Sequence, residues 1–177
     1  MSGRLALGAA VVTAAVLLAG CASSPTVTPV LVVTATATPA PTPSPTLEIS
    51  AGRLLVEVGQ GTFVVDVADD ATERAVGLSG RDRLDDGEGM WFDLGVERKV
   101  GFWMRGMLIP LDMIWVDAGL EVVAVSADVP VPAPGTEAGE LALYGPDVPV
   151  SYVLEINAGL ASELGIEPGM RVTITGP

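Results

Sequence analysis

The clearest pattern along the chain is an alternation of apolar and polar residues that begins near residue 53. The segments 53–59 (RLLVEVG) and 62–68 (TFVVDVA) alternate with period two and contain many β-branched residues. Only Gln60 and Gly61 separate them, so the pattern predicts a β-hairpin. Runs of the same kind predict further strands at 90–94, 99–104, 111–117, 120–127, 151–156 and 170–175.

Two segments have the signals of short helices. The segment DDATERAVGLSG (69–80) offers Asp69 or Asp70 as an N-cap and Gly77 or Gly80 as a C-terminal stop. A second helix is predicted over AGLASELG (158–165), because the preceding Asn157 can cap it.

A Pro/Gly-rich loop is predicted over residues 128–149. It is much longer than the ~4 to 6 residues typical of connections in compact domains, which makes it either a functional loop or a tolerated surface insertion. With seven or eight short strands and two short helices, the pattern predicts a mainly β domain with minor α content. We expect a small barrel-like or rolled sheet.

The segment FWMRGMLIPLDMIWVD (102–117) is strongly apolar, yet it contains one charge of each sign, Arg105 and Asp112. These charges and Pro110 divide it into apolar pieces far shorter than the ~20 residues that span a bilayer. We therefore predict a hairpin in the core, in which RGMLIP joins two strands and Gly106 supplies the freedom to turn.

The first 47 residues differ sharply in composition from the rest. The apolar stretch 5–18 is followed by LLAGC, which resembles the lipobox of bacterial lipoprotein signal peptides. Cys21 is the only cysteine and follows the apolar stretch directly, so the pattern favours lipidation over the competing interpretation, a buried free thiol. We predict a signal peptide over 1–20, a lipidated Cys21 with a Pro/Thr-rich linker over 21–47, and a folded domain over 48–177.

Lipidation would make the mature protein an extracytoplasmic lipoprotein, anchored to a membrane of the bacterial cell envelope. More than one acyl chain of the palmitate type on Cys21 is enough for stable anchoring, whereas a single chain is marginal.

Charge and composition exclude several function classes. All 22 acidic residues lie from Glu48 onward, against eight basic residues in the same region, which opposes binding to nucleic acid. The chain has no histidine, the commonest ligand of zinc and copper and the commonest general base near neutral pH. We therefore predict no nucleic-acid partner, no metal and no cofactor.

Five motifs occur in an order and spacing that resemble one known family, namely RAVGLSGRDRL, EGMWF, FWMRGMLIPLDMIWVD, YVLEINAG and LGIEPGMRV. The family is the bacterial and archaeal domain-of-unknown-function family 192, and the resemblance covers residues 54–176. It implies a small, mostly β, often exported domain without an established biochemical activity. The family often has Lys-Asn where this chain has Arg105 and Gly106, and usually an aliphatic residue in place of Trp91.

The polar members of these motifs, together with one tryptophan, form the candidate site, which comprises Arg74, Arg81, Trp103, Arg105, Asp112, Glu155 and Asn157. A structural interpretation pairs Arg74 or Arg81 with Asp112 or Glu155 as a buried ion pair, because a charge beside a core is costly unless it is paired. A binding interpretation uses the arginines to hold a small anionic or sugar-like ligand, with Trp103 or Trp115 as a stacking wall.

Two further interpretations use other chemistry. Asp112 and Glu155 could act as paired carboxylates of a hydrolase or lyase on an envelope saccharide. Three methionines, at 104, 107 and 113, could hold Cu(I), although methionines in so apolar a segment usually fill a core. We predict a non-enzymatic module that binds a ligand or an envelope protein, and we assign no catalytic residue.

Overall fold

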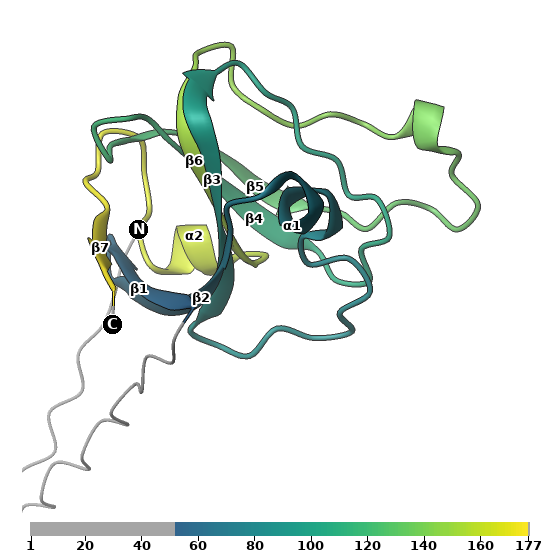
Figure 1. Ribbon diagram of the computed structural model, residues 1–177. Helices are drawn as coiled ribbons and strands as arrows, with labels where there is room; N and C mark the ends of the chain where they lie inside the picture. Colours follow the sequence, from purple (N-terminus) through teal and green to yellow (C-terminus); the bar gives the residue numbers. More distant parts are fainter. Residues whose placement is uncertain (1–51, 177) are drawn as a thin grey trace, which may run out of the picture. The chain divides into compact units, whose positions relative to one another are not determined.

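The computed structural model describes residues 52–176, and the predicted signal peptide, Cys21 and the predicted linker lie outside these residues. The domain is built on a seven-stranded sheet with the strand order β5-β4-β6-β3-β2-β1-β7 (Figure 1). The strands are β1 (Arg53–Val58), β2 (Gly61–Ala68), β3 (Glu88–Arg98), β4 (Leu111–Val116), β5 (Val122–Val129), β6 (Val150–Asn157) and β7 (Thr173–Thr175). The helices are α1 (Ala71–Val76), α2 (Leu160–Glu163) and the 3₁₀ turn η1 (Ala138–Glu140).

All neighbouring strands are antiparallel except β2 and β3, which run parallel. A parallel pair needs a crossover connection, and here the connection contains α1. The predicted hairpin of β1 and β2 is confirmed, because Val58 lies opposite Gly61 across a two-residue turn.

The sheet is rolled, so that its two edges approach each other. The N–H of Val122, at the start of β5, donates to the carbonyl of Met170 at 2.8 Å, and the N–H of Gly169 donates back to Val122 at 2.8 Å. These bonds join the start of β5 to the segment that leads into β7, although β5 and β7 do not pair with each other. The predicted mainly β rolled sheet is confirmed.

Each face of the sheet carries its own hydrophobic core. Alternate residues of a strand point to opposite faces, so Met113 and Trp115 of β4 enter the first core, while Ile114 and Val116 enter the second. Leu78, just after α1, packs into the first core, and Ala161 of α2 packs into the second. In Figure 1, α2 lies inside the curve of β1, β2 and β7, whereas α1 lies on the other side of the sheet.

The predicted helix α1 is confirmed together with its cap. The Asp70 carboxylate accepts the N–H groups of Thr72 at 2.7 Å and Glu73 at 2.8 Å, and Glu73 accepts the N–H of Asp70 in return. This capping box satisfies donors that the first turn leaves without a partner. Gly77 ends the helix at φ 51°, a conformation that favours glycine.

The predicted hairpin within 102–117 is wrong. Only its second half forms a strand, and both edges of that strand, β4, are occupied by β5 and β6. The first half therefore does not pair with β4. It makes an isolated bridge instead, in which Phe102 and Tyr144 exchange two hydrogen bonds of 2.8 Å. The long loop 130–149 thus covers the segment expected to be the strand 99–104, and it contains the turn η1.

Among residues 52–176, no helix has both the length and the apolar character needed to cross a bilayer.

Candidate functional site

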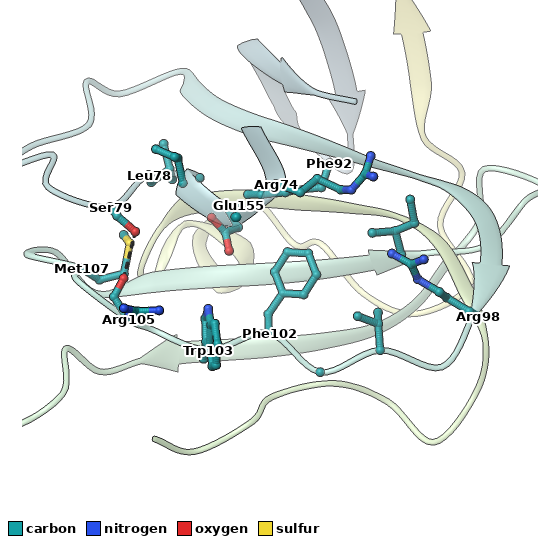
Figure 2. A pocket seen from close by; sticks show the side chains of 16 residues that line it. Arg74, Leu78, Ser79, Phe92, Arg98, Phe102, Trp103, Arg105, Met107 and Glu155 are labelled. Atoms are coloured by element: carbon teal, nitrogen blue, oxygen red, sulfur yellow. Dashed lines mark hydrogen bonds between the residues drawn. The ribbon is translucent and has the colours of Figure 1, made fainter. Parts of the chain in front are cut away.

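A pocket of about 260 Å³ opens on the side of the first core, between α1, the end of β3 and the segment 98–107 (Figure 2). Its volume is close to the lower end of the ~300–1,000 Å³ range of small-molecule sites. Most of the wall is apolar, and its larger apolar side chains are Leu78, Phe92, Leu94, Phe102, Trp103 and Met107.

Three arginines line this pocket, and they come from three different parts of the chain. Arg74 belongs to α1, Arg98 ends β3, and Arg105 lies in the irregular segment before β4. Arg74 is held in place because its guanidinium donates to the backbone carbonyls of Asp69 and Asp93. Among residues 52–176, none of these arginines forms an ion pair.

The position of Arg105 follows from contacts between its own segment and the end of α1. The Ser79 hydroxyl donates to the carbonyl of Arg105 at 2.8 Å, and the N–H of Gly80 donates to Gly106 at 2.9 Å. Gly106 has φ 69°, so the glycine found here suits the backbone better than the family's usual asparagine. The Arg105 guanidinium lies 5.8 Å from the ring centroid of Trp103, which is 46% exposed at the pocket wall.

Glu155 supplies the one carboxyl group among the residues that line the pocket. Figure 2 shows it between Leu78 and Phe92 on one side and Phe102 and Trp103 on the other. The residue is 5% exposed, and within residues 52–176 its carboxyl group makes no hydrogen bond or ion pair. Burial raises the pKa of Glu155 to about 8, so the group is predominantly protonated at pH 7.

Asp112 lies on the opposite face of the sheet from Glu155. In the register of β4 and β6, Asp112 is opposite Ile156, while Glu155 is opposite Met113, and neighbouring positions of a strand face opposite ways. The fully buried Asp112 carboxylate accepts the N–H groups of Asp128 at 2.7 Å and Ala161 at 2.8 Å. The alternative interpretation, in which Asp112 and Glu155 act as paired carboxylates, is therefore wrong, and so is an ion pair between Asp112 and an arginine among the described residues.

The Asp112 carboxylate also replaces the predicted cap of α2. The N-cap is Gly159, whose φ of 87° favours glycine, and Asp112 accepts an N–H in the first turn. Asn157 does not cap the helix, because its side-chain amide donates to the carbonyl of Leu84 at 2.9 Å. Asp112 and Asn157 therefore hold β4, β6, α2 and the loop before β3 together, outside the pocket.

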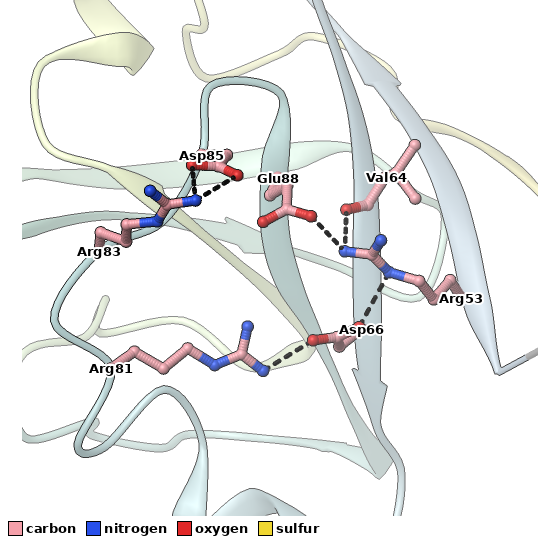
Figure 3. A network of polar contacts seen from close by, with 7 residues as sticks. All are labelled: Arg53, Val64, Asp66, Arg81, Arg83, Asp85 and Glu88. Atoms are coloured by element: carbon pink, nitrogen blue, oxygen red, sulfur yellow. Dashed lines mark hydrogen bonds and ion pairs between the residues drawn. The ribbon is translucent and has the colours of Figure 1, made fainter. Parts of the chain in front are cut away.

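Arg81 belongs to a different polar network, which lies beside β2 (Figure 3). It contacts Asp66 at 2.7 Å, and Arg53 contacts Asp66 at 2.9 Å and Glu88 at 3.0 Å. The predicted ion pair of Arg81 with Asp112 or Glu155 is wrong, because the partly exposed Asp66 binds the guanidinium at the surface. Neither Arg74 nor Arg81 pairs with the two buried acids among the described residues.

Comparisons with known proteins identify the family. The family model described as "Uncharacterized ACR", domain-of-unknown-function family 192 (DUF192), matches residues 46–174. The chain belongs to the DUF192 family.

Two solved structures resemble this DUF192 domain. One is a protein of unknown function from Novosphingobium aromaticivorans, which is 34% identical, with coverage of 78% of this chain and 94% of that chain and a TM-score of 0.59. The other is described as a candidate transcription regulator from Sinorhizobium meliloti, 29% identical, with coverage of 72% and 97% and a TM-score of 0.63. The comparison with curated proteins gave no match.

In this DUF192 domain the pocket contains four of the seven predicted site residues, namely Arg74, Trp103, Arg105 and Glu155. Arg98 lines the pocket but is not among the predicted site residues, because its only signal in the sequence is its place in a charged run directly after a predicted strand. Trp115 is fully buried, so it is not available as a stacking wall. The methionines at 104, 107 and 113 belong to the first core, as expected of core residues rather than copper ligands.

Proposed function

We propose that this protein is a bacterial cell-envelope lipoprotein whose DUF192 domain binds a small anionic ligand without converting it. The observation that carries the proposal is the set of three arginines, Arg74, Arg98 and Arg105, around an otherwise mostly apolar pocket. A guanidinium presents a planar fork of N–H donors, which matches the geometry of a carboxylate or phosphate. Apolar walls strengthen such contacts because they lower the local dielectric constant.

The charge of the remaining domain supports a ligand of low charge. From Glu48 onward the chain has 22 acidic and only eight basic residues, and three of those eight line this pocket. The acidic surface repels anions at long range, and this repulsion grows with the charge of the ligand. The local cluster of arginines attracts anions at short range, so a monoanion with an apolar body suits the pocket best.

Binding fits this pocket better than hydrolysis does. A two-carboxylate mechanism needs a second acid near Glu155, yet the pocket lining contains no other carboxyl group and Asp112 lies on the other face of the sheet. The chain has no histidine that could act as a general base in place of a second carboxylate.

The proposal is tested with the full chain purified in mild detergent, by calorimetric titration with a panel of monoanions that includes benzoate, glucuronate and N-acetylmuramate. The informative variants are Arg98→Gln and Arg105→Gln. The matched control is Arg83→Gln, because Arg83 is exposed, lies outside the pocket lining and pairs with Asp85. Loss of a hydrogen bond between charged groups costs ~1.5–3 kcal/mol, so we expect a loss of affinity of about 10- to 100-fold in the pocket variants only. Equal affinity in all three variants would place the ligand elsewhere.

The proposed anchor has a separate test. Replacement of Cys21 by serine removes the acceptor thiol, so we expect the protein to leave the membrane fraction and to lose the label in cells grown with labelled palmitate. Wild-type protein is the control. A labelled, membrane-bound Cys21→Ser protein contradicts lipidation at this residue.

A further inference from the structure

Glu155 is a buried polar group whose hydrogen-bonding capacity is not used within residues 52–176. It is 5% exposed, and its cross-strand neighbours are Met90 on β3 and Met113 on β4. The oxygen atoms of this carboxyl group are not fully buried, because they reach the pocket, where a hydrogen-bond partner can approach them. The carboxyl group lines the pocket, so the partner can come from a molecule bound there.

The surroundings of Glu155 restrict what this partner can be. The other charged groups that line the same pocket are Arg74 from α1, Arg98 from β3 and Arg105 from the following segment. On β4, which pairs with β6, the residue opposite Glu155 is the apolar Met113. Three fixed positive charges disfavour a cationic ligand group at the carboxyl group. An anionic group on the ligand is better placed at the guanidinium groups than beside an acid.

A protonated carboxyl group has one O–H donor and one carbonyl acceptor. An amide is a matching group, because its carbonyl can accept the O–H or its N–H can donate to the carbonyl oxygen of the acid; in a trans secondary amide one of these two bonds forms with Glu155. A ligand that fits both the arginines and Glu155 therefore has an anionic group and an amide on one apolar body. An N-acylated monoanion, with a carboxylate as its anionic group, is such a ligand.

We propose that the pocket takes an N-acylated monoanion and that the carboxyl group of Glu155, which faces the pocket between Leu78, Phe92, Phe102 and Trp103, binds the amide of this ligand. The inference rests on the proposed function, because the same pocket and arginines hold the anion. Glu155 is here a specificity residue, which selects a neutral amide at the inner end of the site.

The proposal makes binding depend on pH. Glu155 is the one carboxyl group of the pocket lining, so loss of its proton changes the charge that faces a bound ligand. When Glu155 loses its proton, the donor disappears and a negative charge faces an anionic ligand. Because burial places the pKa of Glu155 at about 8, affinity should be constant below that pH and fall by about 10-fold per pH unit above it.

The test compares two probes that differ in the amide, N-acetylphenylalanine and 3-phenylpropanoate, by calorimetric titration of the full chain at pH 6.5 and pH 9.5. We expect N-acetylphenylalanine to bind at least 10-fold more tightly at pH 6.5, with most of this preference lost at pH 9.5. In Glu155→Gln the side-chain amide still offers a donor and an acceptor, so the preference should persist at both pH values. In Glu155→Met the preference should disappear.

The outcomes separate this inference from the proposed function. If both probes bind the wild type equally, and both bind Arg105→Gln more weakly, the role of Glu155 is overturned while anion binding by the pocket is supported. A preference that is unchanged in Glu155→Met likewise overturns it. Failure of both probes to bind the wild-type protein at millimolar concentration overturns both proposals. Folding of the variants is verified independently by their circular dichroism spectra.

Discussion

Met90 on β3 lies directly opposite Glu155 on β6, so the nearest cross-strand neighbour of this buried carboxyl group is a thioether. On the other side of β6 the neighbour is Met113, which is also buried. An acid between two methionines has no cation beside it in the sheet to stabilise its charged form. The folded domain therefore retains the proton of Glu155 at pH values at which the unfolded chain has released it.

This relationship predicts how stability depends on pH. Burial raises the pKa of Glu155 from 4.5 to about 8, so between these values the folded state binds one more proton than the unfolded state. The contribution of Glu155 to the free energy of unfolding should thus be greatest below pH 4.5 and fall by up to about 1.4 kcal/mol per pH unit as pH rises toward 8. Above pH 8 there should be no further loss.

Urea unfolding of the wild type and Glu155→Gln at several pH values between 5 and 8 measures this slope. A glutamine side chain cannot titrate, so the variant should lose the fall in stability, whereas Glu163→Gln, at an exposed position of α2, should keep it. Identical slopes in the wild type and Glu155→Gln would show that Glu155 is ionised in the folded protein.

A second prediction concerns the buried carboxylate of Asp112. In Asp112→Asn only one side-chain oxygen remains, so the N–H of either Asp128 or Ala161 loses its acceptor and faces an NH₂ group. We expect a loss of about 2–3 kcal/mol in the free energy of unfolding, measured by urea denaturation. The control is Asp86→Asn at an exposed position, which should change stability by less than about 0.5 kcal/mol. A small change in the free energy of unfolding of Asp112→Asn would contradict the view that the Asp112 carboxylate stabilises the packing of β5 and α2 on β4.

Gly89 provides a third prediction, because a Cβ atom there would lie 2.7 Å from the backbone carbonyl oxygen of Glu155. Strand β3 would have to move away from β6. Both strands contribute to the pocket lining, so this movement would change the shape of the pocket. We expect Gly89→Ala to lower the free energy of unfolding by about 1–3 kcal/mol and to weaken ligand binding. Gly139→Ala is the matched control, since a Cβ at Gly139 meets nothing within 4 Å. Equal stability of the two variants by thermal unfolding would argue against close packing of β3 on β6.

The fourth prediction separates Arg81 from the pocket. Its side chain is 36% exposed and contacts Asp66, which Arg53 also contacts, so we expect Arg81→Gln to change stability by less than about 1 kcal/mol. Ligand affinity should be the same as in the wild type, in contrast to Arg98→Gln. A loss of affinity in Arg81→Gln, measured by titration, would place Arg81 in the site, as the sequence motifs predicted.

The features that could be predicted from sequence are those that short segments determine. The β1–β2 hairpin follows from period-two alternation around a two-residue turn, and α1 follows from Asp70, Glu73 and Gly77. The failures involve contacts between distant residues. Tyr144 pairs with Phe102 from 42 positions away, and Asp112 contacts α2 across 49 positions.

The candidate site shows the same division. Alternation within β6 predicts that Glu155 and its neighbours face opposite ways, but only the pairing of β6 with β4 shows that Glu155 and Asp112 lie on different faces. Arg98 belongs to the pocket because β3 continues past the bulge between Asp93 and Arg98. No local pattern of apolar residues indicates that continuation.

The pairing of β1 with β7 places Leu55 opposite Thr175, so the domain begins and ends on adjacent strands at one edge of the sheet. Domains whose first and last strands are adjacent are the ones that tolerate insertion into a loop of a host protein. None of the residues that line the arginine pocket belongs to β1 or β7. A label attached to β1 or β7 therefore leaves the residues of the pocket lining chemically unchanged, which makes this edge of the sheet suitable for probes in binding measurements.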